Sequence, residues 1–245
     1  MRWLTLLWML LATALFAQDD IDGFKARVYR SASGDTLPYR IFIPPSYDAQ
    51  KQHPLVLWLH GAGGAGSDNV RNVSDDQIPG TRLWTKPENQ AKHPAFVLVP
   101  QSPGNWVDAL DGLTTEMRLV VEILDSIKAE FNIDVGRVYV AGQSDGGYGT
   151  WNLITQRPEL FAAAIPLCGG GDPRLARRIA KMPIWVFHGR RDDVIPVGES
   201  RRMVDAIRKA GGRPRFTEYP RIGHDIWEPT FAEPQLVPWL FSQRR

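Results

Sequence analysis

Short, nearly unbroken apolar runs alternate with stretches of helical periodicity along most of this chain. The apolar runs fall at 55–59, 95–99, 138–141, 162–167 and 184–187. Strands that are apolar at every position are typical of a parallel sheet with both faces covered by helices. A further strand is expected at 215–219, and the runs 27–30 and 39–43 flank a turn-rich segment that predicts an antiparallel hairpin. The pattern therefore predicts a mostly parallel, eight-stranded sheet.

Helical patterns fill the gaps between these strands. The clearest is 115–131, with Thr114 as its N-cap. Other helices are expected to begin at Ser144 and end near residue 157, to begin at Asp172-Pro173, and to cover 199–209 and 235–242. Strands that alternate with helices indicate a doubly wound α/β domain, in which ligands bind at the carboxyl ends of the strands.

The first 17 residues have a different pattern. Arg2 precedes an almost wholly apolar run over 3–16, and small residues such as Ala14 and Ala17 close it. This order is typical of a signal peptide, and the run is shorter than the roughly 20 residues that span a bilayer. We predict a cleaved signal peptide at 1–17, with an uncleaved anchor as the alternative, a secreted or periplasmic protein, and no membrane span in the mature chain.

Composition narrows the possible partners. Apolar residues make up 43% of the 245-residue chain and charged residues 23%, as in ordinary soluble proteins. A net charge of +2 without a long basic run argues against nucleic-acid binding. Cys168 is the single cysteine, which excludes an intrachain disulfide. We expect it to be a small buried residue at the end of a strand.

The strongest chemical signal is Gly-Gln-Ser-Asp-Gly-Gly at 142–147, between an apolar strand and a helical stretch. That context predicts a nucleophile elbow, a strained turn that presents Ser144 as nucleophile. Glycines flank it because a side chain at Gly142 or Gly146 would collide with neighbouring backbone. The helix N-terminus then directs its free N–H groups towards the site.

A serine nucleophile needs a base, and the chain has five histidines. His53 and His93 precede strands, so we expect them on the surface at the wrong edge of the sheet. His60 and His188 each end a strand. His224 follows the last strand at the carboxyl edge and is the predicted general base.

The base in turn needs a carboxylate to orient it. Asp192 and Asp193 both follow the strand at 184–187, and either completes the order Ser, Asp, His. Neighbouring side chains in a turn diverge, so we expect one of the two to reach His224. Its role would be to fix the imidazole tautomer without taking the proton.

An oxyanion hole needs two converging backbone donors. We expect the N–H of Asp145, which follows the nucleophile, and the N–H of Ala62, which lies in the glycine-rich segment after residue 59. No Gly-Lys-Ser/Thr pattern supports nucleotide binding. The dispersed histidines and the single cysteine give no convincing metal-ligand cluster, so no metal is expected.

Taken together, these segments resemble the α/β-hydrolase superfamily, and within it secreted esterases of the dienelactone hydrolase, phospholipase/carboxylesterase and poly(3-hydroxybutyrate) depolymerase-like families. The matching segments are 59–64 (Leu-His-Gly-Ala-Gly-Gly), 87–90, 99–103 (Val-Pro-Gln-Ser-Pro), 142–151, 166–171, 188–196 and 223–227 (Gly-His-Asp-Ile-Trp). They extend from about residue 37 to the C-terminus in the order that the families keep.

The resemblance implies a single α/β-hydrolase catalytic domain over 18–245 and a cofactor-free hydrolase of esters with small or medium acyl groups. In these families the acid lies four residues after the histidine of the His-Gly pair, which favours Asp192 over Asp193. Two departures stand out. Dienelactone hydrolases proper have cysteine where this chain has Ser144, so lactone hydrolysis of that type is not implied. Asp145 stands where an apolar residue is frequent, and we expect its carboxylate to point away from the oxyanion.

Three aromatic residues, Trp106, Tyr148 and Trp227, are expected near the active edge. If they line the pocket, a small-molecule ester with a feruloyl or acetyl group becomes plausible; otherwise they support the loops. Two alternatives to an esterase are a serine peptidase of the prolyl-oligopeptidase type and a catalytically inactive hydrolase fold that serves as a binding protein.

Overall fold

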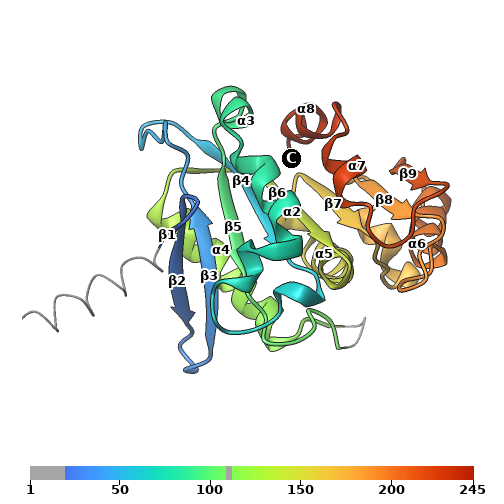
Figure 1. The fold of residues 1–245 in the computed structure, drawn as a ribbon, viewed down its shortest axis with the longest axis horizontal. Helices are drawn as coiled ribbons and strands as arrows, with labels where there is room; N and C mark the ends of the chain where they lie inside the picture. The colour runs from blue at the N-terminus through green and yellow to red at the C-terminus, as the bar shows by residue number, and fades with distance from the viewer. Residues whose placement is uncertain (1–19, 109–111) are drawn as a thin grey trace, which may run out of the picture.

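A computed structural model describes residues 20–108 and 112–245. The predicted signal peptide lies outside this part of the chain. One twisted sheet crosses the molecule, from the N-terminal hairpin on one side to β9 on the other (Figure 1). Its strand order is β1-β2-β3-β5-β4-β6-β7-β8-β9.

The strands of this sheet follow the apolar runs closely. They are β1 (Asp20–Ile21), β2 (Phe24–Arg30), β3 (Thr36–Phe42), β4 (His53–Leu59), β5 (Phe96–Pro100), β6 (Ile133–Gln143), β7 (Ala163–Leu167), β8 (Trp185–Gly189) and β9 (Arg215–Tyr219). The first three pair antiparallel, β3 also pairs antiparallel with β5, and the strands from β5 to β9 pair parallel. The described residues thus form nine strands instead of the expected eight. The additional strand is the two-residue β1, which is too short to leave a hydrophobic pattern.

Helices cover both faces of the sheet. They are α2 (Ile78–Thr85), α3 (Pro87–Lys92), α4 (Thr115–Glu130), α5 (Asp145–Gln156), α6 (Gly198–Lys209), α7 (Trp227–Phe231) and α8 (Leu236–Phe241). Thr114 caps α4 as predicted, because its side chain accepts from the N–H of Met117. Asp172 likewise caps the helix after it, but Pro173–Ile179 is a 3₁₀-helix and not an α-helix. The patterns did not predict α2, α3 and α7.

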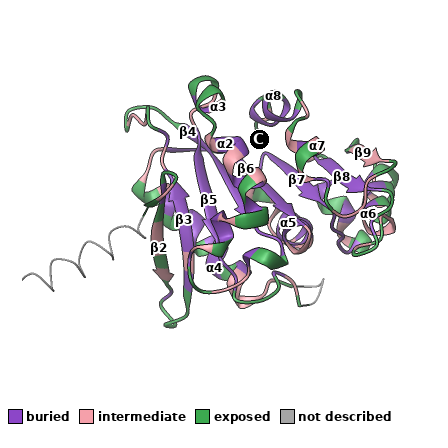
Figure 2. Cartoon of the chain, viewed as in Figure 1, coloured by how far each residue is buried: buried purple, intermediate pink, exposed green. Residues whose placement is uncertain are grey.

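Two hydrophobic cores lie on opposite faces of the sheet, and β4 contributes to both. Leu55, Leu57 and Leu59 belong to the core that also contains α4, α5 and α6 residues. Val56 and Trp58 belong to the core under α2 and α8. Successive side chains of a strand point to opposite faces, so a strand buried on both sides is apolar throughout. Figure 2 shows these central strands as buried.

One of the two histidines expected on the surface is buried instead. His53 is the first residue of β4 and is buried, with its ring near those of Tyr47 and Phe96. His93 stacks on Phe241 with ring centroids 4.6 Å apart. Aromatic neighbours from other elements bury the His53 ring, which the local sequence does not reveal, whereas His93 is half-buried. Among the described residues, none of the helices is long and apolar enough to cross a membrane.

Candidate active site

Ser144 stands on the predicted sharp turn between β6 and α5. Its backbone has φ 57° and ψ −117°, a conformation that costs a non-glycine residue about 1–3 kcal/mol. The turn is held by the N–H of Ser144, which donates to Leu167 O at 2.9 Å. A Cβ on Gly142 would lie 2.3 Å from Gly146 O, and one on Gly146 would lie 2.1 Å from Leu59 O. Both glycines are therefore required by close backbone packing, as the motif predicted.

A continuous hydrogen-bonded chain links the three residues expected to carry the chemistry. His224 Nε2 lies 2.9 Å from Ser144 Oγ, and His224 Nδ1 lies 2.8 Å from Asp192 Oδ2. The three side chains follow β6, β8 and β9 at the carboxyl edge of the parallel sheet. This edge is where ligands bind in open α/β sheets. The geometry is that of a nucleophile, a base and an orienting acid.

The choice between the two candidate acids follows from their environments. Asp192 is 8% exposed and makes the hydrogen bond to His224 Nδ1, whereas the neighbouring Asp193 is exposed. Asp192 Oδ1 also accepts from the N–H groups of Val194 and Ile195, at 3.0 and 2.8 Å. Burial raises the pKa of Asp192, but the Ile195 N–H and His224 outweigh it and hold that pKa below its usual range. The carboxylate is fixed in place and ionised.

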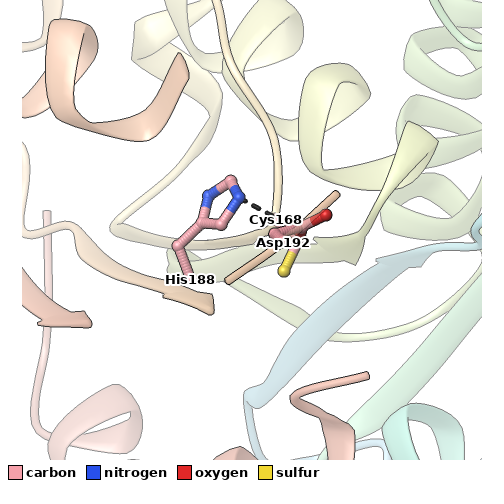
Figure 3. A group of neighbouring side chains, drawn as sticks. All are labelled: Cys168, His188 and Asp192. Carbon is pink, nitrogen blue, oxygen red and sulfur yellow. Dashed lines mark ion pairs between the residues drawn. The ribbon is translucent and has the colours of Figure 1, made fainter. Parts of the chain in front are cut away.

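Two buried side chains, Cys168 and His188, lie beside the carboxylate of Asp192 (Figure 3). His188 Nε2 lies 2.9 Å from Ile195 O and 3.2 Å from Asp192 Oδ2, and its Nδ1 lies 2.8 Å from Ser200 Oγ. Both ring nitrogens are thus occupied. Burial raises the pKa of the Cys168 thiol, which donates to His224 O at 3.5 Å. A protonated thiol and an engaged imidazole fit a hydrogen-bonded support for Asp192 better than a metal site.

The predicted oxyanion donors flank Ser144. Ala62 begins the 3₁₀-helix Ala62–Gly64, and Asp145 begins α5, so neither N–H has a partner within its own helix. A Cβ on Gly61 would lie 3.4 Å from Ser144 Cβ, which places this loop directly beside the nucleophile. The geometry is compatible with two donors that converge on one oxygen.

His60 holds the loop 61–64, which carries one of the two expected oxyanion donors (the oxyanion loop). Its Nε2 accepts from the N–H of Ser102 at 3.0 Å, so the proton is on Nδ1, which donates to Gly61 O at 2.8 Å. Burial lowers the pKa of His60 to about 4 and keeps the ring neutral. His60 was recognised in the sequence as a residue at a strand end, but not as the support of this loop.

Trp106 corrects the prediction that it lines the substrate pocket, because its side chain is 0% exposed. Its Nε1 donates to His60 O at 2.9 Å, and its backbone N–H donates to Asp145 Oδ2 at 3.0 Å. The Asp145 carboxylate thus accepts from a backbone N–H on the Trp106 segment. Burial raises the pKa of this carboxyl to about 6. Trp106 links the two sides of the site and does not line it.

The other two aromatic candidates are partly exposed. Tyr148 lies one turn after Ser144 on α5, and its N–H donates to Ser144 O at 3.2 Å. The ring of Trp227 meets that of His224 edge to face, with centroids 5.5 Å apart. Both rings have surface available for a substrate.

The sequence analysis missed two buried glutamines beside the site, Gln77 and Gln143. Gln77 Oε1 accepts from the N–H of Gly61 at 3.0 Å, and Gln143 Nε2 donates to Asp76 O at 3.1 Å. Gln77 ends a 3₁₀-helix in a segment without a periodic pattern, so no local signal predicts its position.

Comparison with known proteins places this geometry in context. A thermostable esterase of known structure is 40% identical in sequence to this chain. The two structures match with a TM-score of 0.86 over 92% of this chain and 64% of the esterase. A probable feruloyl esterase C from Aspergillus niger is 27% identical over 78% of this chain and 68% of its own length. The bifunctional acetylxylan esterase/xylanase XynS20E from Neocallimastix patriciarum is 32% identical over 58% of this chain.

This chain spans 20% of the length of the bifunctional enzyme. The model of the dienelactone hydrolase family matches residues 83–234, more than half of the chain, which includes Ser144, Asp192 and His224. The match agrees with the parallel sheet, the elbow after β6 and the order of the site residues. The chain therefore belongs to the dienelactone hydrolase family and has the α/β-hydrolase fold.

Proposed function

We propose that this protein is a serine carboxylic-ester hydrolase that acts through an acyl-enzyme. The observation that carries the proposal is the hydrogen-bonded chain from Ser144 Oγ through His224 to the buried carboxylate of Asp192. Serine replaces the cysteine of dienelactone hydrolases proper, and the esterases similar to this chain support ester hydrolysis.

In the proposed mechanism, Ser144 Oγ attacks the ester carbonyl while His224 Nε2 takes its proton. The tetrahedral oxyanion accepts hydrogen bonds from the N–H groups of Ala62 and Asp145. As the intermediate collapses, the C–O bond to the alcohol breaks and His224 returns the proton to the leaving oxygen. Water then repeats both steps on the acyl-enzyme and releases the acid and Ser144. Each oxyanion donor is worth about 10²–10³ in rate in such sites.

For the substrate we propose small to medium acyl groups, including acetyl and feruloyl esters. Tyr148 and Trp227 offer partly exposed rings beside Ser144 and His224, which suit an aromatic acyl group or a compact one. The names of two similar proteins point the same way, since they are a feruloyl esterase and an acetylxylan esterase. We further propose that residues 18–245 form one catalytic domain and that the protein is secreted or periplasmic.

The test is hydrolysis of p-nitrophenyl acetate, butyrate and octanoate and of methyl ferulate by the mature protein, beside Ser144→Ala. Activity in the parent and a loss of about 10⁶ in the variant would support the proposal. A serine peptidase would also hydrolyse these activated esters, so peptide substrates are assayed beside them, and faster cleavage of the peptides would favour the peptidase alternative. Equal activity, or none, in parent and variant would overturn the serine mechanism.

A further inference from the structure

We propose that Gln77 is a positioning residue that sets the oxyanion hole, with Gln143 as its partner. Gln77 fixes the loop 61–64 against the nucleophile elbow, so that the N–H of Ala62 is the one that meets the oxyanion. This inference rests on the esterase function proposed above and names residues outside the triad and the two donors.

The first observation is the hydrogen bond that the N–H of Gly61 makes. This N–H donates to Gln77 Oε1 at 3.0 Å, and the Gly61 carbonyl accepts from His60. The Gly61 N–H shares its peptide plane with the His60 carbonyl, which accepts from Trp106 Nε1 at 2.9 Å, so this plane cannot rotate without breaking a buried hydrogen bond. The following plane carries the Gly61 carbonyl, held by His60, together with the N–H of Ala62. The next N–H along the chain is that of Ala62, at the start of the short helix. Gln77 and Trp106 hold the first plane and His60 holds the second, and together they fix the direction of the proposed donor.

The second observation is a tie from the elbow to the same segment. Gln143, the residue before Ser144, donates from Nε2 to Asp76 O at 3.1 Å. A Cβ on Gly61 would lie 3.4 Å from Gln143 Cγ and 3.4 Å from Ser144 Cβ. The segment Asp75–Gln77 thus contacts the oxyanion loop through Gln77 and the elbow through Gln143. It holds the two halves of the proposed oxyanion hole at a fixed separation.

The third observation is that Gln77 is itself anchored. It is fully buried and precedes α2, where Thr81 Oγ1 donates to Gln77 O at 3.1 Å. The position of Gly80 in α2 leaves no room for a Cβ above the Trp58 ring, which would lie 2.0 Å away. Trp58 lies in β4, the strand that leads into the oxyanion loop. The packing of α2 on Trp58 therefore holds α2 and the oxyanion loop against the same strand.

The polar atoms of these glutamines also argue against a purely packing role. Gln77 Nε2 and Gln143 Oε1 are buried and have no hydrogen-bond partner within the described residues. An unsatisfied buried polar group destabilises a fold, so an apolar side chain of the same shape would stabilise it more. We infer that the amides are retained for the bonds that their other atoms make, to Gly61 and Asp76.

The experiment compares Gln77→Met with Gln90→Met in the whole protein. Gln90 is also buried and also bonds backbone groups, namely Trp84 O and Ala95 O, but it lies on α3 away from the elbow. The measurements are kcat and KM for p-nitrophenyl acetate, affinity for a boronic acid that forms a tetrahedral anion on serine, and thermal unfolding. Parent and Ser144→Ala are assayed first, because an inactive parent refutes the esterase and not the role of Gln77.

The expected result for Gln77→Met is a 10- to 100-fold loss in kcat, part of the 10²–10³ that a whole donor contributes. KM should stay within about threefold, boronate affinity should fall with kcat, and Gln90→Met should keep both parameters. A Gln77→Met protein that matches Gln90→Met in kcat and boronate affinity refutes the positioning role.

A second variant, Gln77→Glu, covers the case in which Gln77→Met does not fold. Its carboxylate keeps an acceptor for the Gly61 N–H but places a charge in a buried site, which lowers stability. We expect Gln77→Glu to melt below the parent yet to lose less than tenfold in kcat. A loss in kcat as large as that of Ser144→Ala in folded Gln77→Glu would overturn the proposal.

Discussion

Replacing Asp192 with asparagine is the sharpest test of the proposed charge arrangement. Asp192 Oδ1 accepts two backbone N–H groups and Oδ2 accepts His224 Nδ1. In the asparagine variant, the amide oxygen has to stay with the two N–H groups, because the flipped amide would leave them facing an NH₂ group. Each unsatisfied buried group costs about 1–3 kcal/mol, so the flip is disfavoured by roughly 2–6 kcal/mol.

The amide NH₂ then faces His224 Nδ1 and donates to it. The imidazole proton is forced onto Nε2, the atom that must take the proton of Ser144. Loss of the correct tautomer in a serine hydrolase triad lowers kcat about 10⁴-fold. At 1.36 kcal/mol per factor of ten, that is about 5 kcal/mol of barrier. Asp192→Asn should therefore be folded and nearly inactive, yet above the level of Ser144→Ala.

The matched control is Asp193→Asn, the same change at the next residue. Asp193 is exposed, so losing its screened charge should change kcat by less than about twofold. The assay is p-nitrophenyl acetate hydrolysis by purified variants whose circular dichroism matches the parent. An Asp192→Asn protein within tenfold of the parent, or an Asp193→Asn protein as impaired as Asp192→Asn, would refute the reasoning.

Three further predictions concern the surroundings of the triad. Gly146→Ala should fail to fold, since its Cβ would lie 2.1 Å from Leu59 O, whereas Gly104→Ala, with nothing within 4 Å, should melt like the parent. Trp227→Ala should raise KM for methyl ferulate more than for p-nitrophenyl acetate, because the partly exposed ring beside His224 is the proposed aromatic contact; equal effects on both esters would contradict that contact. Asp145→Asn should melt several degrees above the parent at pH 8 and close to it at pH 4, because burial raises the carboxyl pKa to about 6 from 3.8 and the ionised Asp145 lowers the stability of the folded parent at the higher pH; identical melting at pH 8 would show that the charge is not destabilising.

The sequence predicts the parts of this fold that have strong local causes. The buried strands are apolar at every position, and the turn at Ser144 needs glycines on both sides for steric reasons. The helices α2, α3 and α7 were missed because they are short and depend on tertiary contacts, as where Gly80 packs on Trp58. A two-residue strand such as β1 has no period to detect.

The site shows the same division between local and distant causes. Ser144, Asp192 and His224 each follow a recognisable strand, so topology brings them to one edge. Trp106 was misplaced because its burial depends on His60 and Asp145, which lie 46 and 39 residues away in the chain. The sequence indicates that an aromatic residue is near the site, but not whether it faces the substrate or the core.

Burial shifts the pKa values of two residues beside the proposed oxyanion hole in opposite directions, and both shifts favour the neutral form. Trp106 joins His60, whose pKa burial lowers to about 4, to Asp145, whose pKa burial raises to about 6. Between about pH 4 and 6, Asp145 is protonated and His60 is neutral in the folded protein. In the unfolded chain over the same range, Asp145 is ionised and His60 is protonated. The folded and unfolded states therefore bind the same number of protons at these two residues. The contributions of Asp145 and His60 to the pH dependence of the free energy of unfolding cancel in the parent. Asp145→Asn removes the Asp145 contribution and leaves that of His60. The free energy of unfolding of the variant should therefore rise with pH from about 4 to 6.5, because over this range the unfolded chain loses a proton from His60 that the folded protein does not bind.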